Sequence, residues 1–418
     1  MSIVNSLVRE IKFTVRDRTI WFWMAIVFGL SAISLGFGIA EVERQNASIQ
    51  RLIKIDQQDR VAQLEKQKSW GSAAYYSFHL SYDAPSDFAF AAMGLRDSQP
   101  WKHRVRMLAL EGQIYERDVA NPSFALIGRF DFAFFTAFII PLILIILLYD
   151  LRSGERIAGR YKLLEATVGQ ARNFWLLRAG LRGAALFVCI IVPLVVAGFI
   201  VGTQASTLLF ACLYVFVYVA FWTLLCSAFS AWNKTGSVIL MSLVTVWVCT
   251  AVILPAGARL TIDKAVELPS GSDILMLQRE AVNDAWDLPR EATMNAFFEQ
   301  YPEWRDYKPV ESSFEWQWYY AFQQVGDQQA DPVSNAYRNG RLRRDQLATW
   351  AALLAPPSLL ERSLQSLAHT DLQASIHYED RVRAYHAELK GFYYPKLFQN
   401  QVFDQSQLRD LPQYKVTQ

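Results

Sequence analysis

The chain has 418 residues, of which 52% are hydrophobic and only 19% are charged, and its net charge is +2. Soluble domains carry roughly a quarter charged residues, and nucleic-acid-binding domains are usually strongly basic, so both classes are disfavoured. Charged residues are also absent from long stretches, above all the 51 residues between Arg182 and Lys234. Because a helix of roughly 20 apolar residues crosses the hydrocarbon of a bilayer, the sequence predicts an all-α integral membrane protein.

Five membrane-spanning helices are expected. In chain order they cover residues 19–40, 132–149, 184–202, 206–229 and 237–257. The first is too long for a secretory signal, whose apolar region has about 7–15 residues, so it is interpreted as a retained anchor. Two long segments, 41–131 and 258–418, lie outside the spans.

The charge distribution predicts the orientation. Residues 1–18, 150–183 and 230–236 together hold 12 basic and 5 acidic residues, whereas 41–131 has 12 of each and 258–418 has 17 basic and 22 acidic. Basic short segments remain in the cytoplasm. The N-terminus and the 150–183 loop are therefore expected on the cytoplasmic side of a bacterial inner membrane, and the two long segments are expected on its periplasmic or extracellular side.

The first 18 residues are predicted to form an amphipathic helix on the cytoplasmic surface of the bilayer. Val4, Val8, Ile11 and Val15 recur every three or four residues, which places one apolar stripe on a helix that also carries basic side chains.

The two external segments are expected to be helical. The polar 41–70 stretch should continue the first span as a stalk, and a helix over 101–119 should end at Asn121 and Pro122. In the C-terminal segment the prolines and the apolar periodicity predict helices over 272–286, 290–300, 314–325, 341–353, 357–368 and 370–392.

Aromatic residues are concentrated between 297 and 322. Two readings stay open: rings of the domain core together with rings at the headgroup level, or a surface that contacts a ligand or a partner. The candidates for such a surface are Trp304, Trp316, Trp318, Tyr319 and Tyr320.

The sequence has no pattern that predicts catalysis. A phosphate loop, a nucleophile elbow and a zinc-binding histidine pair are all missing, so the chain is not expected to be an enzyme or to hold a cofactor or metal by itself. The five histidines are interpreted as solvated or partnered surface residues: His79, His103, His369, His377 and His386. Cys189, Cys212, Cys226 and Cys249 all fall within spans, so no disulfide is expected outside the membrane.

The 150–183 loop is the most suggestive cytoplasmic feature. A helix that starts near Ser153, capped by its hydroxyl, would present Glu155, Arg156 and Arg160 on a charged face and the pair Leu163 and Leu164 on an apolar one. Such a helix could bind a groove of a partner, or it could be an ordinary basic loop beside the membrane.

One longer stretch carries a family resemblance. From Asn121 the chain reads NPSFALIGRFDFAFFTAFIIPLILIILLYDLRSGERIAGRYKLLEA, with Asp131 opening a span and Pro141 inside it. This resembles the permeases of ABC-2 type exporters. Residues 84–101 and 354–395 are similar to the subgroup with two large extracytoplasmic helical domains. Relatives usually have a sixth span after a segment like the one that ends at Gln418, so a sixth span is expected by resemblance.

The resemblance implies partners and a coupling site. Two copies of a separate ATPase, which binds ATP and Mg, are expected at the cytoplasmic loop. A second permease subunit, homologous or identical, is expected beside this chain in the lipid bilayer, and a periplasmic partner is compatible with the large external domains. No nucleic acid is expected. The residues that would couple to the ATPase are Asp150, Ser153, Glu155, Arg156, Gly159, Arg160, Leu163 and Leu164.

Three functions are consistent with these observations. The chain could be an exporter permease. It could instead use the same ATPase to move its external helices without transport. A membrane scaffold or sensor without energy input is the third possibility.

Overall fold

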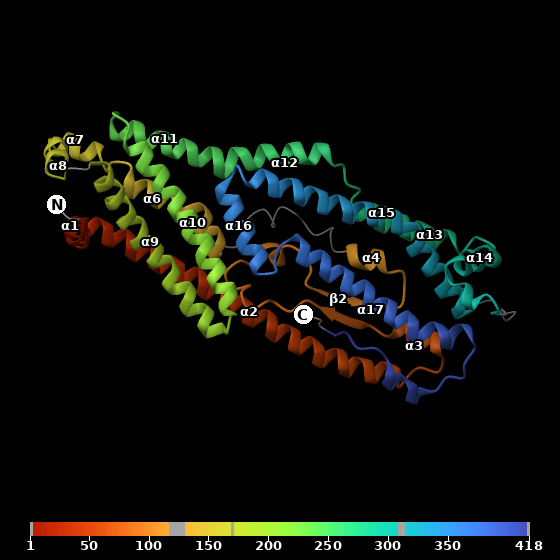
Figure 1. The fold of residues 1–418 in the computed structure, drawn as a ribbon. Coiled ribbons are helices and arrows are strands. Elements are labelled where there is room, and N and C mark those ends of the chain that lie inside the picture. The colour runs from red at the N-terminus through yellow and green to blue at the C-terminus, as the bar shows by residue number, and fades with distance from the viewer. Residues whose placement is uncertain (1–2, 117–129, 169–170, 308–313, 416–418) are drawn as a thin grey trace.

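The computed structural model describes residues 3–116, 130–168, 171–307 and 314–415, and the rest of the chain lies outside the described residues. A bundle of apolar helices forms one end of the molecule and a mainly helical domain forms the other (Figure 1). The all-α class is therefore confirmed, although the described part also contains a two-stranded antiparallel sheet. We call the bundle end that carries α1 (Ile3–Arg16), α7 (Ser153–Ile157) and α8 (Tyr161–Val168) the loop end.

Helix α2 (Arg18–Leu64) connects the two ends of the molecule. It begins at Asp17, whose carboxylate accepts the backbone N–H of Thr19 at 2.9 Å, as is usual for a helix N-cap. Its first half packs against α9 (Ala171–Val201) in the bundle, and its second half runs along the domain (Figure 1). The predicted stalk is thus the direct continuation of the first span.

Five helical segments of the described chain are long and apolar enough to cross a membrane. The first is the N-terminal part of α2 and the third is α9. The second comprises α5 (Phe132–Phe134), η3 (Phe135–Ile139) and α6 (Ile140–Leu148), the fourth is α10 (Ala205–Ser230), and the fifth comprises α11 (Gly236–Val248), η4 (Cys249–Ile253) and α12 (Leu254–Ala265). All four cysteines are free thiols on these helices.

The second span contains one wide π-helical turn, η3, immediately before Pro141. Proline has no backbone N–H and its ring displaces the carbonyl four residues earlier, which here belongs to Ala137. The Tyr218 hydroxyl of α10 donates to that carbonyl, and the Trp247 indole of α11 donates to the next one, Phe138, at 3.2 Å. The backbone groups freed by the irregular turn are therefore bonded by neighbouring helices, as hydrocarbon requires.

The domain is built from both long segments. From the first come α3 (Trp70–Tyr76), β1 (His79–Tyr82), η1 (Gly94–Asp97), β2 (Lys102–Val105) and α4 (Leu110–Tyr115). From the second come α13 (Gly271–Asp284), α14 (Arg290–Gln300), η5 (Pro302–Trp304), α15 (Trp316–Ala352), α16 (Pro356–Leu367), α17 (Leu372–Phe398) and η6 (Gln405–Asp410).

The helix predicted over 101–119 is wrong in its first half. Residues 102–105 form β2, which pairs antiparallel with β1 so that His79 lies opposite Val105. The signal was present, because His103, Val105 and Met107 are buried and alternate with more exposed basic residues, which is the period of a strand. The predicted stop at Asn121 and Pro122 lies outside the described residues.

The helices predicted over 314–325 and 341–353 are parts of one helix, α15. Pro332 lies inside it at an exposed position, where the missing N–H leaves a carbonyl that water can reach. Pro395 likewise lies inside α17, which is longer than predicted.

The segment 86–95 joins the bundle to the domain. It approaches α2 so closely that a Cβ at Gly38 would lie 1.9 Å from the Phe90 carbonyl oxygen. Thr203, at the turn after α9, donates to the Asp87 carbonyl at 2.7 Å, and the Leu95 N–H donates to Thr370 at 2.9 Å. Helix α16 packs beside α10 in the same region, so the bundle and the domain share one apolar core.

Candidate functional site: the elbow at the loop end

The segment 150–168, called the elbow below, consists of two short helices. The single helix expected over 153–165 is wrong, because α7 ends at Ile157 and α8 begins at Tyr161. Gly159 lies between them with a φ of +70°, a left-handed conformation that glycine adopts without strain. The predicted cap is wrong as well, since Arg152 holds the N-cap position and the Ser153 hydroxyl is buried against the start of α11 near Gly236.

A buried ion cluster fixes the elbow to the bundle. Arg178 of α9 donates to both carboxylate oxygens of Glu10 in α1, at 2.7 and 3.3 Å, and to Glu155 of α7 at 3.2 Å. Glu10 and Arg178 are 2% and 6% exposed, so their interaction is shielded from water. One guanidinium therefore holds three segments that are far apart in the sequence.

A second contact links the elbow to the turn between α10 and α11. Arg156 donates to the backbone carbonyl of Trp232 at 2.7 Å and to that of Ala231 at 3.4 Å. These carbonyls end α10 and have no intrahelical partner, so a cation is favoured there. Displacement of α7 would consequently act on the ends of α9, α10 and α11 together.

The outward surface of the elbow is an apolar tip with basic neighbours. Ile157 is 83% exposed and Leu163 is 65% exposed, and Arg160 and Lys162 are exposed beside them. Large apolar side chains at this exposure are typical of an interaction surface when they form a patch. We call Ile157, Gly159, Arg160, Lys162 and Leu163 the tip.

The structure divides the predicted coupling residues into two groups. Gly159, Arg160 and Leu163 belong to the tip, and Asp150 is exposed at the end of the second span. Ser153, Glu155, Arg156 and Leu164 are at least partly buried, and the first three hold the elbow in place. Sequence reasoning missed Ile157, Glu10 and Arg178, and the only signal for Ile157 was a large apolar residue directly before the Ala158-Gly159 turn.

The N-terminal helix directs Glu10 inward and leaves apolar side chains exposed. Glu10 is buried on Arg178, whereas Val8, Ile11 and Val15 are 46%, 43% and 55% exposed. That this helix lies on the membrane surface stays a prediction.

The aromatic candidates lie in the domain at the end far from the bundle, so the expectation of rings at the level where the spans end is wrong (Figure 1). Trp318 and Tyr320 are buried in its core, and Trp316 and Tyr319 are packed among other rings beside them. Trp304 differs, since it lines an open cavity of about 780 Å³ together with Tyr301, Asp327 and Lys390.

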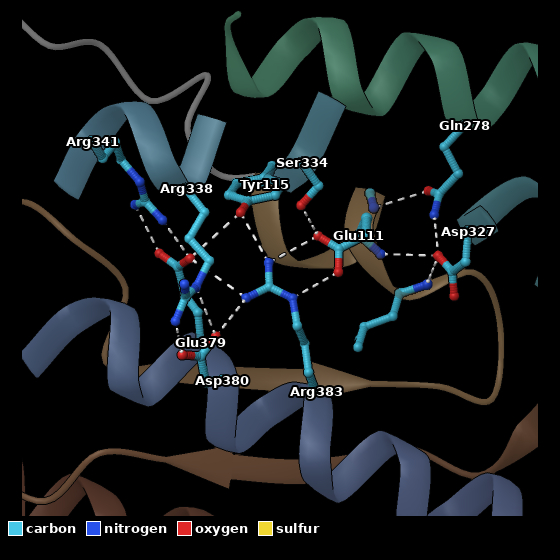
Figure 2. Close-up of polar contacts among 12 residues, drawn as sticks. Glu111, Tyr115, Gln278, Asp327, Ser334, Arg338, Arg341, Glu379, Asp380 and Arg383 are labelled. Atoms are coloured by element: carbon cyan, nitrogen blue, oxygen red, sulfur yellow. Dashed lines mark hydrogen bonds and ion pairs between the residues drawn. The ribbon is translucent and has the colours of Figure 1, made fainter. Parts of the chain in front are cut away.

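A network of polar side chains clamps α4 between α13, α15 and α17, as Figure 2 shows. Asp327 accepts the N–H groups of Leu110 and Glu111 at 2.6 and 3.1 Å, and Gln278 accepts that of Gly112 at 2.9 Å. These donors are the free N–H groups that every helix start must satisfy. The network thus joins the two long segments into one domain.

The carboxylate of Glu111 lies at the centre of this network and is bonded by Arg383 at 2.7 and 2.9 Å (Figure 2). Burial acts to raise the pKa of Glu111, but the hydrogen bonds and charge of Arg383 outweigh it and lower the pKa overall. Burial raises the pKa of Asp327, and the charge of Lys390, whose Nζ lies 3.5 Å from Oδ2 of Asp327, reduces this rise. Both carboxylates thus have a basic partner, which stabilises the contact between α4 and its neighbours.

Three histidines are not on the surface as expected. His79, His103 and His386 are 0%, 5% and 1% exposed. Burial, with a smaller contribution from the charge of Arg60, lowers the pKa of His79 to about 3, so it is neutral at physiological pH. Among the described residues no three His, Cys, Asp or Glu side chains are placed to hold a metal ion.

Comparison with known proteins gives one match. Residues 274–417, from α13 to beyond η6, match the family described as "Domain of unknown function (DUF3526)". The match covers about a third of the chain and leaves out the elbow and all five spans. No curated protein and no solved structure matches.

Proposed function

We propose that this chain is the membrane permease subunit of an ATP-driven exporter of the ABC-2 type, and that a separate ATPase docks on the elbow. The observation that supports this most directly is the combination of an exposed apolar tip with the buried Glu10–Arg178–Glu155 cluster behind it. Ile157 and Leu163 give one short segment two exposed apolar side chains for a partner to contact, and the buried cluster fixes that segment to the bundle so that it can transmit force. In this proposal the loop end is cytoplasmic, as the positive charges of the short segments favour.

In the proposed mechanism the ATPase binds ATP and closes, and the closure pushes the tip. Because Arg156 holds the end of α10 and Arg178 belongs to α9, the push tilts the spans as a group. A second permease subunit, homologous or identical, completes the membrane pathway, and two ATPase copies with ATP and Mg supply the energy.

The proposal is tested by changing the tip without touching the interior. Ile157→Asp should abolish copurification of an ATPase subunit carrying a phosphate loop, because a desolvated carboxylate at the interface is costly. Val402→Asp is the matched control, since Val402 is equally apolar, is 88% exposed and lies in the domain. If both variants retain the ATPase and its stimulation in nanodiscs, the elbow is not the docking site.

A second function, mechanotransmission, is favoured by the continuity of the long helices. Helix α2 runs without a break from the loop end into the domain, where Arg60 reaches the Pro412 carbonyl and Arg104 of β2 pairs with Asp59 at 2.7 Å. Such a rod would carry motion from the elbow to the domain without a cargo pathway. Measured flux of a cargo through reconstituted complexes would exclude this alternative, whereas ATP-dependent domain motion in complexes without flux would support it.

The scaffold or sensor remains the alternative without energy input. The copurification experiment distinguishes it from the other two functions, because a scaffold or sensor requires no ATPase at the elbow and none should copurify.

A further inference from the structure

A cavity of about 1010 Å³ lies where the bundle meets the domain. Helices α10 and α12 form its bundle side, and α15 and α16 form its domain side. Its volume is at the upper end of the range for small-molecule pockets, about 300–1,000 Å³. It is separate from the elbow, which lies at the other end of the spans (Figure 1).

The bundle side of the cavity includes an apolar strip that continues the surface of two spans. Tyr214 of α10 lines it together with Pro255, Ala258 and Ile262, which recur every three or four residues on one face of α12. Opposite them α15 contributes mainly small residues, among them Ala348 and Ala351, which leave the space open. An occupant can therefore extend an apolar part along the spans.

The cavity also carries charges of both signs, which come from α12 as well as from α15 and α16. Arg344 pairs with Asp263 at 2.8 Å and Arg362 pairs with Asp345 at 2.6 Å, so these four charges are largely balanced. Arg259 differs, because its side chain is 73% exposed and its nearest carboxylate oxygen, on Asp263, is 3.8 Å away. Its guanidinium is available for the planar, bidentate recognition of a phosphate.

Large apolar side chains are also exposed next to the residues that line the cavity. Leu260 of α12 is 66% exposed, and Trp350 and Leu354 at the C-terminal end of α15 are each 71% exposed. A tryptophan beside aliphatic residues is typical of the level where hydrocarbon gives way to headgroups. An occupant would thus reach the cavity from the lipid rather than from water.

We infer that this cavity binds one phospholipid with a zwitterionic headgroup from the bilayer leaflet on the domain side. Its phosphate lies at Arg259, its amine lies near Glu361, the acidic residue with which α16 lines the cavity, and an acyl chain follows Tyr214 and Pro255. A free phosphate would leave the apolar half empty, and a simple detergent would leave the charges unmatched. The inference goes beyond the proposed function and requires neither an ATPase nor transport.

The test fills the cavity by mutation. The full chain, purified in mild detergent from membranes that contain phosphatidylethanolamine and phosphatidylglycerol, is washed with detergent and analysed by native mass spectrometry. Wild type should retain one phosphatidylethanolamine, and Ala258→Trp should lose it by at least about fivefold. Ala256→Trp is the matched control, because Ala256 lies two residues away on the exposed face of α12 and does not line the cavity.

A second pair of variants covers the case in which Ala258→Trp does not fold. Arg259→Gln should weaken rebinding of added phosphatidylethanolamine, while Lys264→Gln on the same helix should not, and inorganic phosphate should not displace the lipid. Equal lipid retention in wild type and both cavity variants would overturn the inference. Retention of phosphatidylglycerol alone would overturn the assigned headgroup.

Discussion

Arg178 bonds both carboxylate oxygens of Glu10 from a position 168 residues later in the chain, with its Nε at 2.7 Å and its Nη2 at 3.3 Å. The guanidinium also lies over the rings of Phe13, Phe174 and Trp175 at 4.8 to 5.4 Å from their centres. Charge pairing and ring contacts thus act on one buried group. This places the N-terminal helix, the elbow and α9 in a single rigid unit.

Arg178→Ala should destabilise the chain strongly. Removal of one partner of a buried pair leaves the carboxylate of Glu10 uncompensated, which costs about 3–5 kcal/mol. The thermal midpoint of the purified chain in detergent measures the effect. Arg9→Ala is the control, because the Arg9 side chain is 41% exposed and its distance to Glu10 is 3.8 Å. Similar midpoints for both variants would contradict the structural role of Arg178.

Two glycines of α2 should respond in opposite ways to alanine. Gly38→Ala should destabilise by about 1–3 kcal/mol, because its Cβ would overlap the Phe90 carbonyl and force α2 away from the 86–95 segment. Gly36→Ala has open space around its Cβ and should be neutral or stabilise by up to about 1 kcal/mol. Thermal midpoints of the two variants check the pair, and equal shifts would refute the close approach.

Tyr218→Phe tests the hydrogen bond beside Pro141. Loss of the hydroxyl leaves the Ala137 carbonyl without its donor from α10, and an unsatisfied buried group costs about 1–3 kcal/mol. Tyr214→Phe on the same helix should change the midpoint little, since Tyr214 is 37% exposed. A loss confined to Tyr214→Phe would show that the π-turn does not depend on the Tyr218 hydroxyl.

His79→Leu should reduce the sensitivity of the chain to acid. The folded-state pKa of His79 is about 3, whereas an unfolded histidine titrates near 6.5, so the unfolded chain binds the extra proton. The free energy of unfolding is therefore highest above about pH 6.5 and decreases as the pH falls, by about 2 kcal/mol at pH 5.

The measurement compares unfolding midpoints at pH 7.5 and pH 5. Neither ring nitrogen of His79 has a hydrogen-bond partner within the described residues, so leucine removes no bond. His377→Leu is the control at an exposed position of α17. An unchanged difference between the two pH values in His79→Leu would show that this histidine does not carry the effect.

Much of the fold could be predicted from local patterns. Hydropathy located the five spans, and polar periodicity located the stalk and most domain helices, because both depend on neighbours within a few turns. The strand at Lys102–Val105 was missed because four alternating residues look like part of a helix until β1 pairs with them. Pro332 predicts a helix end from local sequence, although packing of α13 against α15 outweighs its local cost.

The sequence singled out the loop that contains the elbow but not the arrangement of its side chains. Charge and resemblance indicated the 150–183 loop, and coupling to an ATPase there stays a prediction. The sequence could not separate Glu155, which points to Arg178, from Ile157, which points to solvent. That separation depends on where α1 and α9 lie, and both are distant in sequence from the elbow.

By itself the sequence determined the class of this protein, since runs of apolar residues of membrane length leave no soluble alternative. Tertiary structure alone decided which charges are buried. In the sequence Glu10 resembles any acidic residue of a surface helix. Only its pairing with Arg178 offsets the desolvation cost of burying its carboxylate. The physical reason is that desolvation of a charge is compensated by partners in space, and spacing along the chain does not encode them.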